Sequence, residues 1–335
     1  MPRFIAPELA TLIKEPLEGD GWFHELKFDG YRMLCHLEKR KTHFWSRNGK
    51  DWSAKFPHLA KSLTSFPATT AILDGEVVAM DASGRASFQK LQQAIGKTGD
   101  SGFIYEVFDL LYLNGFILTR VKLKDRKELL RQLFESIGSG SPVHYSDHVE
   151  GNGRLFFKQA CDFGIEGIVS KLADSIYEST RTRSWVKVKC IQRQEFVIAG
   201  YTLSKKGFPG FGSLALGVYD DGKLIYTGRV GTGFSIKQRL ELQKKLDRIA
   251  RPSSPFATKP KDPGLRNAVW AEPELVGEVE FTEWTSDGLI RHPSFQGLRA
   301  DKSAREVIRE KPVEVTESGK GRAKVSRRPR TRPKN

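Results

Sequence analysis

A lysine between two apolar runs is the candidate nucleophile of this sequence. Lys27 stands in the stretch ELKFDGYR, after one apolar run and before a glycine turn into the next. A lysine amine attacks phosphorus only when it is neutral, so nearby positive charge or burial must lower its pKa. An isolated KxDG sequence is more often a solvated turn. The nucleophile hypothesis therefore needs partners elsewhere in the chain.

The stretch WVKVK offers two cations for a phosphate. Its alternation places Lys187 and Lys189 on one face of a strand, while Val186 and Val188 point the other way. Two cations on one strand face repel each other unless an anion lies between or above them. A solvated edge strand would show the same pattern. Beside a phosphate, the pair would hold the α-phosphoryl group and lower the pKa of Lys27.

Two carboxylates and an aromatic residue complete the set. Glu76 in LDGEVV and Glu166 in EGIVSK each lie beside glycine and against an apolar strand, where an unpaired charge is costly. A divalent cation such as Mg²⁺ would remove that cost and bridge nucleotide phosphates. A strand-end salt bridge is the alternative. Phe108 in FDLL could stack on a purine or simply belong to the core.

The composition favours two domains and a polyphosphate partner. The 335 residues carry a net charge of +15, although a basic protein without such a partner is also possible on charge alone. Residues 318–335 hold eight basic and no acidic residues and are expected to be a disordered tail. No signal peptide or membrane span is indicated, so an intracellular protein is expected. The three scattered cysteines indicate neither a zinc site nor a disulfide, and are expected to be small buried residues.

The elements expected around Lys27 form an α+β domain of mostly antiparallel sheets. Apolar runs predict strands at residues 22–27, 31–37, 71–80, 103–110 and 185–191. Helical spacing predicts core-packing helices at residues 124–136 and 154–163, the second through Leu155, Phe156, Ala160 and Phe163.

After residue 191 the sequence changes to short strands separated by glycine turns, which is typical of a small β-barrel such as an OB-fold. Asp221-Gly222 predicts a hairpin, and Ser235 is expected to cap a helix that ends near residue 249. Strands are expected at residues 195–201, 213–219, 223–230 and 278–284, with an irregular loop at 251–263. The expected domains are 1–191, 192–312 and a basic tail, 313–335.

Taken in order, these motifs resemble the covalent nucleotidyltransferase superfamily. In detail they are similar to the ligase domain of the bacterial ATP-dependent DNA ligases associated with end joining. The resemblance runs from about residue 22 to residue 302 and rests on the series ELKFDGYR, SRNGKD, LDGEVV, FDLL, EGIVSK, WVKVK and RHPSFQGLRADK.

The resemblance implies a role for each residue. Lys27 would carry AMP, Glu25 would help to recognise adenine, and Phe108 would stack on it. Glu76 and Glu166 would serve the ribose and the metal. The remaining expected residues contact sugar or phosphates: Arg32 and Arg47 (ribose or DNA 5′-phosphate), Lys187 and Lys189 (α-phosphate), and Arg299, Asp301 and Lys302 (pyrophosphate).

The resemblance also implies the partners. ATP is the expected substrate with Mg²⁺ or Mn²⁺, and nicked duplex DNA is the expected partner, sealed in DNA repair. We expect a monomeric, stand-alone core in the bacterial cytoplasm, associated with the nucleoid, with a Ku-like end-binding protein as a further partner. An RNA ligase and a GTP-using capping guanylyltransferase share the lysine chemistry. A nucleic-acid-binding protein with an inactive site is the rival of another class.

Overall fold

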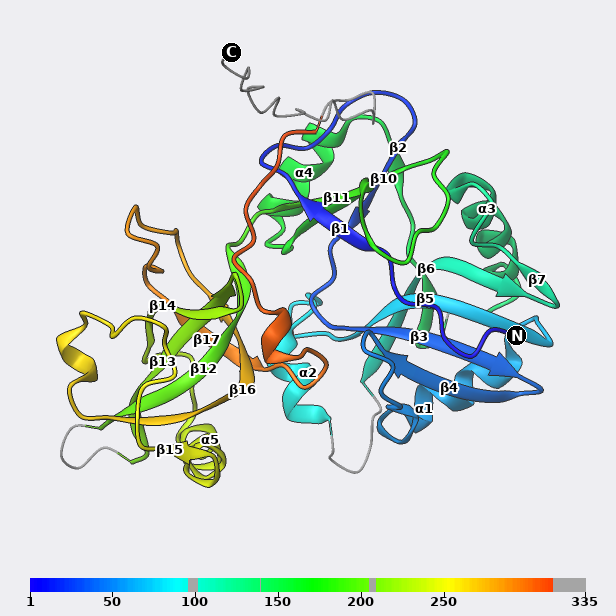
Figure 1. Ribbon diagram of the computed structural model, residues 1–335. Coiled ribbons are helices and arrows are strands. Elements are labelled where there is room, and N and C mark those ends of the chain that lie inside the picture. Colours follow the sequence, from blue (N-terminus) through cyan, green and yellow to red (C-terminus); the bar gives the residue numbers. More distant parts are fainter. Residues whose placement is uncertain (96–101, 139, 205–208, 316–335) are drawn as a thin grey trace, which may run out of the picture.

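The protein has two lobes joined by two crossings of the chain. The computed structural model describes residues 1–95, 102–138, 140–204 and 209–315. Figure 1 shows the blue-to-green part of the chain in one lobe and the green-to-orange part in the other. The chain enters the second lobe after β11 (Arg181–Lys189) and returns to the first lobe through its last described residues. No helix in these residues is both long and apolar enough to cross a membrane.

Two sheets build the first lobe, and both are mainly antiparallel. One has the order β4 (Lys41–Ser46), β3 (Tyr31–Glu38), β5 (Thr70–Ala79), β6 (Phe103–Leu113), β7 (Phe116–Ile117), and β8 (Val143–Tyr145) pairs with β6 in parallel. The other has the order β1 (Leu9–Leu12), β11, β10 (Gly167–Leu172), β2 (Trp22–Leu26), β9 (Val149–Glu150). Because Lys27 links β2 of one sheet to β3 of the other, it lies where the two sheets meet.

Helices cover the outer faces of these sheets. They are α1 (Pro57–Ser62), α2 (Phe88–Ala94), α3 (Leu123–Phe134) and α4 (Gly153–Asp162), with short 3-10 turns at Ser53–Lys55 and Leu63–Ser65. Leu130 of α3 and Ala160 of α4 are buried, as the helical spacing predicted. Leu155 and Phe163 do not join the core, since they are 57% and 73% exposed. Phe163 follows the last turn of α4, where the side chain no longer faces the sheet.

The second lobe is a strongly curved sheet with one long helix. Its strands have the order β14 (Lys223–Val230), β13 (Phe211–Asp220), β12 (Arg193–Leu203), β16 (Ala268–Glu280), β15 (Ala250–Arg251), and β17 (Ser294–Leu298) pairs with β16. The helix is α5 (Ile236–Arg248), and 3-10 turns lie at Pro263–Leu265 and Ala304–Glu306. Ser235 caps α5 with Gln238 in a reciprocal capping box, as predicted.

The predicted hairpin at Asp221-Gly222 is confirmed. Both residues have positive φ, 46° and 73°, which a tight two-residue turn between twisted strands requires. Of the strand expected at residues 278–284, only 278–280 are strand; they are the end of β16, which begins ten residues earlier at Ala268. Pro273 argues against a strand in the sequence, because proline is rare inside strands. It lies where pairing with β12 jumps from Leu275 to Trp270, so its missing N–H costs no ladder bond to that strand.

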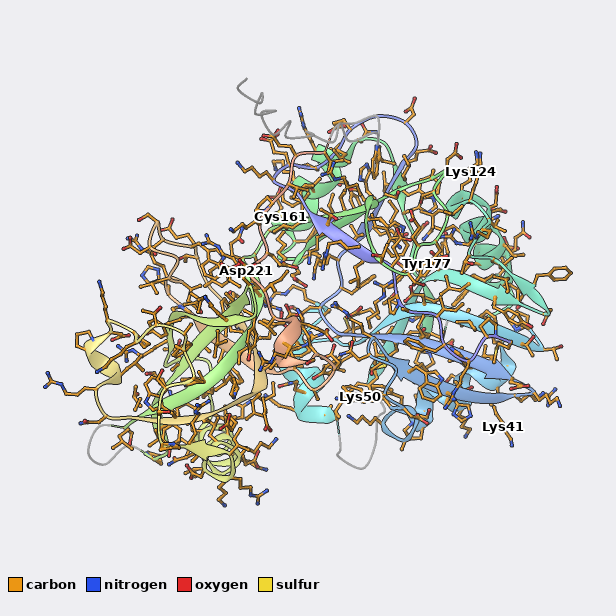
Figure 2. The ribbon with its side chains drawn as sticks, viewed as in Figure 1. Lys41, Lys50, Lys124, Cys161, Tyr177 and Asp221 are labelled. Carbon is orange, nitrogen blue, oxygen red and sulfur yellow. A yellow bond between two sulfur atoms is a disulfide. The ribbon has the colours of Figure 1, made fainter. Side chains whose placement is uncertain are left out.

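The prediction for the cysteines was wrong for two of the three. Cys161 and Cys190 form a disulfide with their Cα atoms 5.3 Å apart, and Cys161 is labelled in Figure 2. The chain turns back between them, because the backbone N–H of Cys190 donates to the carbonyl of Glu166 at 2.9 Å. A count of cysteines cannot reveal a pair that only the fold brings together. Cys35 is free and buried, as expected.

Candidate active site

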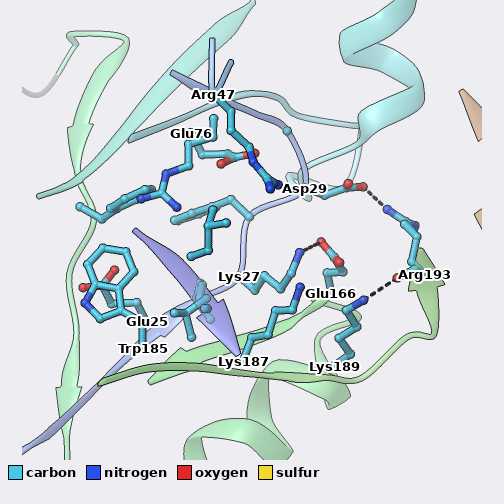
Figure 3. Close-up of a pocket in the computed structure, with 18 of the residues that line it drawn as sticks. Glu25, Lys27, Asp29, Arg47, Glu76, Glu166, Trp185, Lys187, Lys189 and Arg193 are labelled. Carbon is cyan, nitrogen blue, oxygen red and sulfur yellow. Dashed lines mark hydrogen bonds and ion pairs between the residues drawn. The ribbon is translucent and has the colours of Figure 1, made fainter. Parts of the chain in front are cut away.

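A single cavity of about 210 Å³ between the lobes gathers every residue assigned a site role in the predicted set except Asp301. From the first lobe it is lined by Glu25, Lys27, Arg32, Arg47, Glu76, Phe108, Glu166, Lys187 and Lys189, and from the second by Arg299 and Lys302. Residues up to 277 positions apart, Glu25 and Lys302, thus face one space. Figure 3 shows Lys27, from the turn after β2, and Lys187 and Lys189, from β11, pointing into it.

Lys27 is held by the turn between β2 and β3. Its backbone N–H donates to the carbonyl of Gly167 at 2.9 Å, which joins the end of β2 to the start of β10. Gly30 ends the turn because a Cβ at this position would collide with the carbonyl of Val77. The Lys27 ammonium forms an ion pair with Glu166, whose side chain is only 6% exposed (Figure 3). The nucleophile candidate is therefore anchored beside a carboxylate.

The pKa of Lys27 does not move in the direction that the sequence suggested. Burial alone lowers it, but Glu166, Asp29 and Glu76 together raise it above its usual value. The same pairing lowers the pKa of Glu166, although burial alone would raise it. Lys187 and Lys189, which were expected to lower the pKa of Lys27, share the carboxylate of Glu310, which offsets one of their two charges. Lys27 is thus protonated here and must give up a proton before it can attack.

The two lysines of β11 share a face, as predicted. Val186 and Val188 are buried on the opposite side, at 0% and 2% exposure. The ammonium groups of Lys187 and Lys189 lie 2.6 and 2.7 Å from the two carboxylate oxygens of Glu310, and Lys189 also donates to the carbonyl of Arg193 at 2.6 Å. Burial lowers the pKa of Lys187 to about 8. This pair therefore holds an anion already.

Glu25 lies at the far end of the cavity, next to two aromatic rings. Lys127 and Lys171 donate to its two oxygens at 2.7 and 2.6 Å, and all three side chains are at most 3% exposed. The Lys171 ammonium also lies 4.3 Å from the ring centroid of Phe108 and 4.2 Å from that of Trp185. The half-buried ring of Phe108 lines the cavity. This end has a flat apolar wall beside hydrogen-bonding groups, as a nucleobase requires.

Two arginines from the first sheet face the middle of the cavity. Arg32 makes a bidentate pair with the buried Asp74, at 2.9 and 2.6 Å, so its guanidinium has a fixed orientation. Burial lowers the pKa of Arg47, against the attraction of Glu195 and Glu306. A lowered pKa indicates a guanidinium whose charge is poorly compensated, which is what an incoming anion stabilises.

Carboxylates also gather here, but they do not form a ready metal site. Burial raises the pKa of Glu76 to about 8, although Lys27, Arg299 and Arg32 oppose the shift. Among the described residues, no group of three or more His, Cys, Asp or Glu side chains is arranged to hold a metal ion. Any cation bound near Glu76 and Glu166 would need further oxygen ligands from a substrate.

The second lobe closes the cavity through the segment RHPSFQGLRADK. Arg299 forms a bidentate pair with Asp301 at 2.9 and 2.8 Å and a further ion pair with Glu278 at 3.0 Å. Its guanidinium lies 5.0 Å from the ring centroid of Tyr31, so the second lobe contacts the turn that carries Lys27. Lys302 pairs with Glu195 at 3.2 Å.

Several residues that line the cavity were not anticipated, among them Arg193, Lys171 and Glu310. Arg193, the first residue of β12, pairs with Asp29 in the KFDG turn and with Glu280 at 2.8 Å (Figure 3). Lys171 could have been found, because it ends the EGIVSK motif. Glu310 belongs to no motif, since it lies in an irregular segment eight residues after the end of RHPSFQGLRADK.

A lysine that shares one cavity with further cations and with carboxylates, beside an aromatic wall, is the arrangement that a nucleotide-binding site with a lysine nucleophile requires. Residues 6–189 match the family model described as ATP dependent DNA ligase domain, and residues 208–302 match the ATP dependent DNA ligase C terminal region. The chain therefore belongs to the ATP-dependent DNA ligase family. The expected fold class, a nucleotidyltransferase domain followed by an OB-fold domain, is confirmed.

Within this family the chain is similar to the LigD group. It is 39% identical over 316 residues to the Multifunctional non-homologous end joining protein LigD of Pseudomonas aeruginosa, covering 93% of this chain and 37% of the relative. It is 32% identical to the SPbeta prophage-derived DNA ligase-like protein LigB of Bacillus subtilis, covering 88% of this chain and 99% of the relative. The chain thus spans less than half the length of the LigD relative.

A solved structure supports the same grouping. It is titled mycobacterial DNA ligase D complexed with ATP and MES, has 34% sequence identity, and matches with a TM-score of 0.68 over 91% of this chain and 98% of that chain. Both lobes therefore have counterparts in a protein that was solved with ATP.

Proposed function

We propose that this chain is an ATP-dependent DNA ligase that seals nicks between a 5′-phosphate and a 3′-hydroxyl in duplex DNA through a lysyl-AMP intermediate on Lys27. The observation that carries the proposal is the placement of Lys27 in one cavity with two lysines, Lys187 and Lys189, and two carboxylates, Glu76 and Glu166. This arrangement, in a member of the ATP-dependent DNA ligase family, supports phosphoryl transfer to the lysine.

In the first step the Lys27 amine attacks the α-phosphorus of ATP. An N–P bond forms as the P–O bond to pyrophosphate breaks, and the electrons of that bond leave with pyrophosphate. Lys27 first loses its proton to solvent, because the lowered pKa of Glu166 makes that carboxylate a poor proton acceptor. Lys187 and Lys189 then neutralise charge on the α-phosphoryl oxygens, and the Arg299–Asp301 pair with Lys302 orients pyrophosphate.

The nucleoside lies toward the other end of the cavity. We assign adenine to the space beside Phe108 and Glu25, and the ribose or the DNA 5′-phosphate to Arg32 and Arg47. In the second step a 5′-phosphate oxygen attacks the phosphorus of lysyl-AMP and releases Lys27. In the third step the 3′-hydroxyl attacks the 5′-phosphate, and AMP leaves.

A divalent cation fits the oxygen ligands of this cavity. Mg²⁺ is commonly bound by one or two carboxylates together with substrate phosphates, and Glu76 and Glu166 are such carboxylates. Mg²⁺ or Mn²⁺ held there would neutralise charge on the phosphate oxygens. Transfer of the Lys27 proton away from the ion pair frees Glu166 for this role.

The partners follow from the same reaction. Nicked duplex DNA is held mainly through its phosphates, so binding weakens with salt. We assign adenylation to residues 1–191 and closure over the nucleotide to residues 192–312. The expected tail, 313–335, lies outside the described residues from position 316 onward. We further propose a monomer that acts in DNA repair on the bacterial nucleoid, with a Ku-like end-binding protein as an additional partner.

The direct test is transfer of label from nucleotide to protein. The purified chain, treated with pyrophosphate to remove any AMP it carries, is incubated with α-labelled ATP or GTP and Mg²⁺, and label on the denatured chain is counted. We expect label from ATP, none with Lys27→Ala, and discharge of the label by nicked duplex DNA.

Other outcomes lead to other conclusions. Label from GTP alone would move the protein to the capping class, and discharge by nicked RNA but not by DNA would make it an RNA ligase. Absence of label from either nucleotide, in a folded protein that still binds DNA, would replace the ligase proposal with a binding function.

A further inference from the structure

A segment of the second lobe runs back across the cavity and docks on the first lobe. We call residues 307–315 the strap. At its start the Val307 carbonyl accepts from the backbone N–H of Tyr219 at 2.7 Å, and near its end the Val313 N–H donates to the carbonyl of Leu12 in β1 at 2.9 Å. Figure 1 shows this orange-to-red segment passing from the second lobe toward β1 and α4.

Between these two anchors, the strap backbone is fixed on both sides of Glu310. The side chain of Gln194 receives a hydrogen bond from the backbone N–H of Glu310 at 3.2 Å and donates one to the carbonyl of Ile308 at 3.1 Å. Gln194 is itself only 3% exposed, so it is a rigid support. The strap therefore presents the Glu310 side chain to the cavity in one orientation.

The carboxylate of Glu310 uses both oxygens on the paired lysines of β11. Lys187 lies 2.6 Å from one oxygen and Lys189 lies 2.7 Å from the other. The two ammonium groups hold the pKa of Glu310 well below its usual range, despite burial. Its side chain is 19% exposed, so solvent only partly screens these bonds. A carboxylate that bridges two ammonium groups makes the contacts that two phosphoryl oxygens would make.

We propose that Glu310 is an internal occupant of the phosphate site, which binds Lys187 and Lys189 in place of the α-phosphoryl group and must withdraw before a nucleotide can bind. The proposal rests on the proposed function, which assigns these lysines to the α-phosphate. The apparent affinity for nucleotide is thus the intrinsic affinity multiplied by the fraction of molecules in which Glu310 has left the lysines. It also keeps two neighbouring ammonium groups paired until substrate arrives.

The test compares nucleotide affinity with and without the Glu310 charge. Lysyl-AMP formation by the full chain is measured against ATP concentration, after treatment with pyrophosphate, for the wild type, Glu310→Gln and Glu314→Gln. Glu314 is exposed and lies four residues further along the strap, so its substitution removes the same charge from the same segment. We expect the KM for ATP to fall about tenfold in Glu310→Gln, with little change in kcat, and to stay unchanged in Glu314→Gln.

A KM in Glu310→Gln equal to or above that of the wild type would overturn the proposal. So would an equal fall in Glu314→Gln, which would indicate a general charge effect. Lys187→Ala and Lys189→Ala distinguish a failure of the Glu310 proposal from a failure of the phosphate assignment. If both lose lysyl-AMP formation while Glu310→Gln is unchanged, only the role of Glu310 fails. If both form lysyl-AMP normally, the phosphate assignment in the proposed function fails first.

A second measurement uses the wild-type protein and therefore does not depend on whether the variants fold. Hydrogen exchange of residues 308–315 is followed by mass spectrometry for the protein with and without AMP on Lys27. We expect the amides of Glu310 and Val313 to exchange at least several times faster in the adenylated protein, because AMP displaces the carboxylate and loosens the strap. Equal exchange in the two forms contradicts the proposal.

Discussion

Reduction of the Cys161–Cys190 disulfide should destabilise the first lobe by an amount that depends on the number of residues between the two cysteines. The two cysteines are 29 residues apart, and the chain-entropy relation for a loop of this size gives about 3.6 kcal/mol at 25 °C. Glu166, Lys187 and Lys189 all lie inside this loop, so the link also constrains the cavity wall. Loss of the link should therefore be visible as an easier unfolding of the lobe that holds Lys27.

Urea unfolding, followed by tryptophan fluorescence, measures the effect. Trp22 and Trp185 are buried on the sheet that the disulfide borders, at 1% and 2% exposure. The wild type and Cys161→Ser are each unfolded with and without reductant. We expect reductant to shift the wild-type curve to that of Cys161→Ser and to leave the variant unchanged.

Thiol titration of the denatured, unreduced chain provides a second readout. One reactive thiol, from Cys35, is expected. Three thiols would show that the disulfide does not form in solution. An unchanged unfolding curve in a chain with one thiol would instead refute the assigned magnitude.

Three further predictions concern single side chains. Burial lowers the pKa of Lys187 to about 8, so this side chain loses its charge as the pH rises through 8. The KM for ATP should therefore rise between pH 7 and 9. Lys187→Arg should remove that rise, because arginine stays charged. Arg126 and Asp109 form a pair with 0% exposure on both sides, so Arg126→Met should cost about 3–5 kcal/mol of unfolding free energy in urea, and the added Asp109→Leu should recover most of it. Arg193→Ala removes the ion pair to Asp29 across the lobes and the pair to Glu280 within the second lobe, so lysyl-AMP formation should slow about tenfold. Arg266→Ala, which changes an exposed arginine, should leave it unchanged.

Short-range patterns in the sequence predicted the parts of the site that lie on regular strands. The alternation of Lys187 and Lys189 with two valines was sufficient to place both ammonium groups on one face, because side chains of a strand alternate. Asp221-Gly222 likewise predicted its hairpin, since few other residues adopt positive φ at both turn positions.

Properties that depend on distant neighbours could not be predicted in this way. The pKa of Lys27 rises because Glu166, which is 139 residues away, forms an ion pair with it. The disulfide and the contact of Glu310 with β11 have the same origin, since each joins segments that only the folded chain brings together. A motif fixes which chemical groups are available, but it does not fix which of them neutralise one another.

The net charge of the cavity affects its selectivity between nucleotides. Ten cationic side chains and seven carboxylates line it, so at full ionisation the cations are in excess by three, and by four once Glu310 has withdrawn. A nucleoside triphosphate carries a comparable negative charge, whereas a nucleoside monophosphate carries much less. Total charge therefore favours the substrate over spent AMP at this location. The net charge of the cavity, which no individual contact determines, thus favours both the release of AMP and the binding of the next ATP.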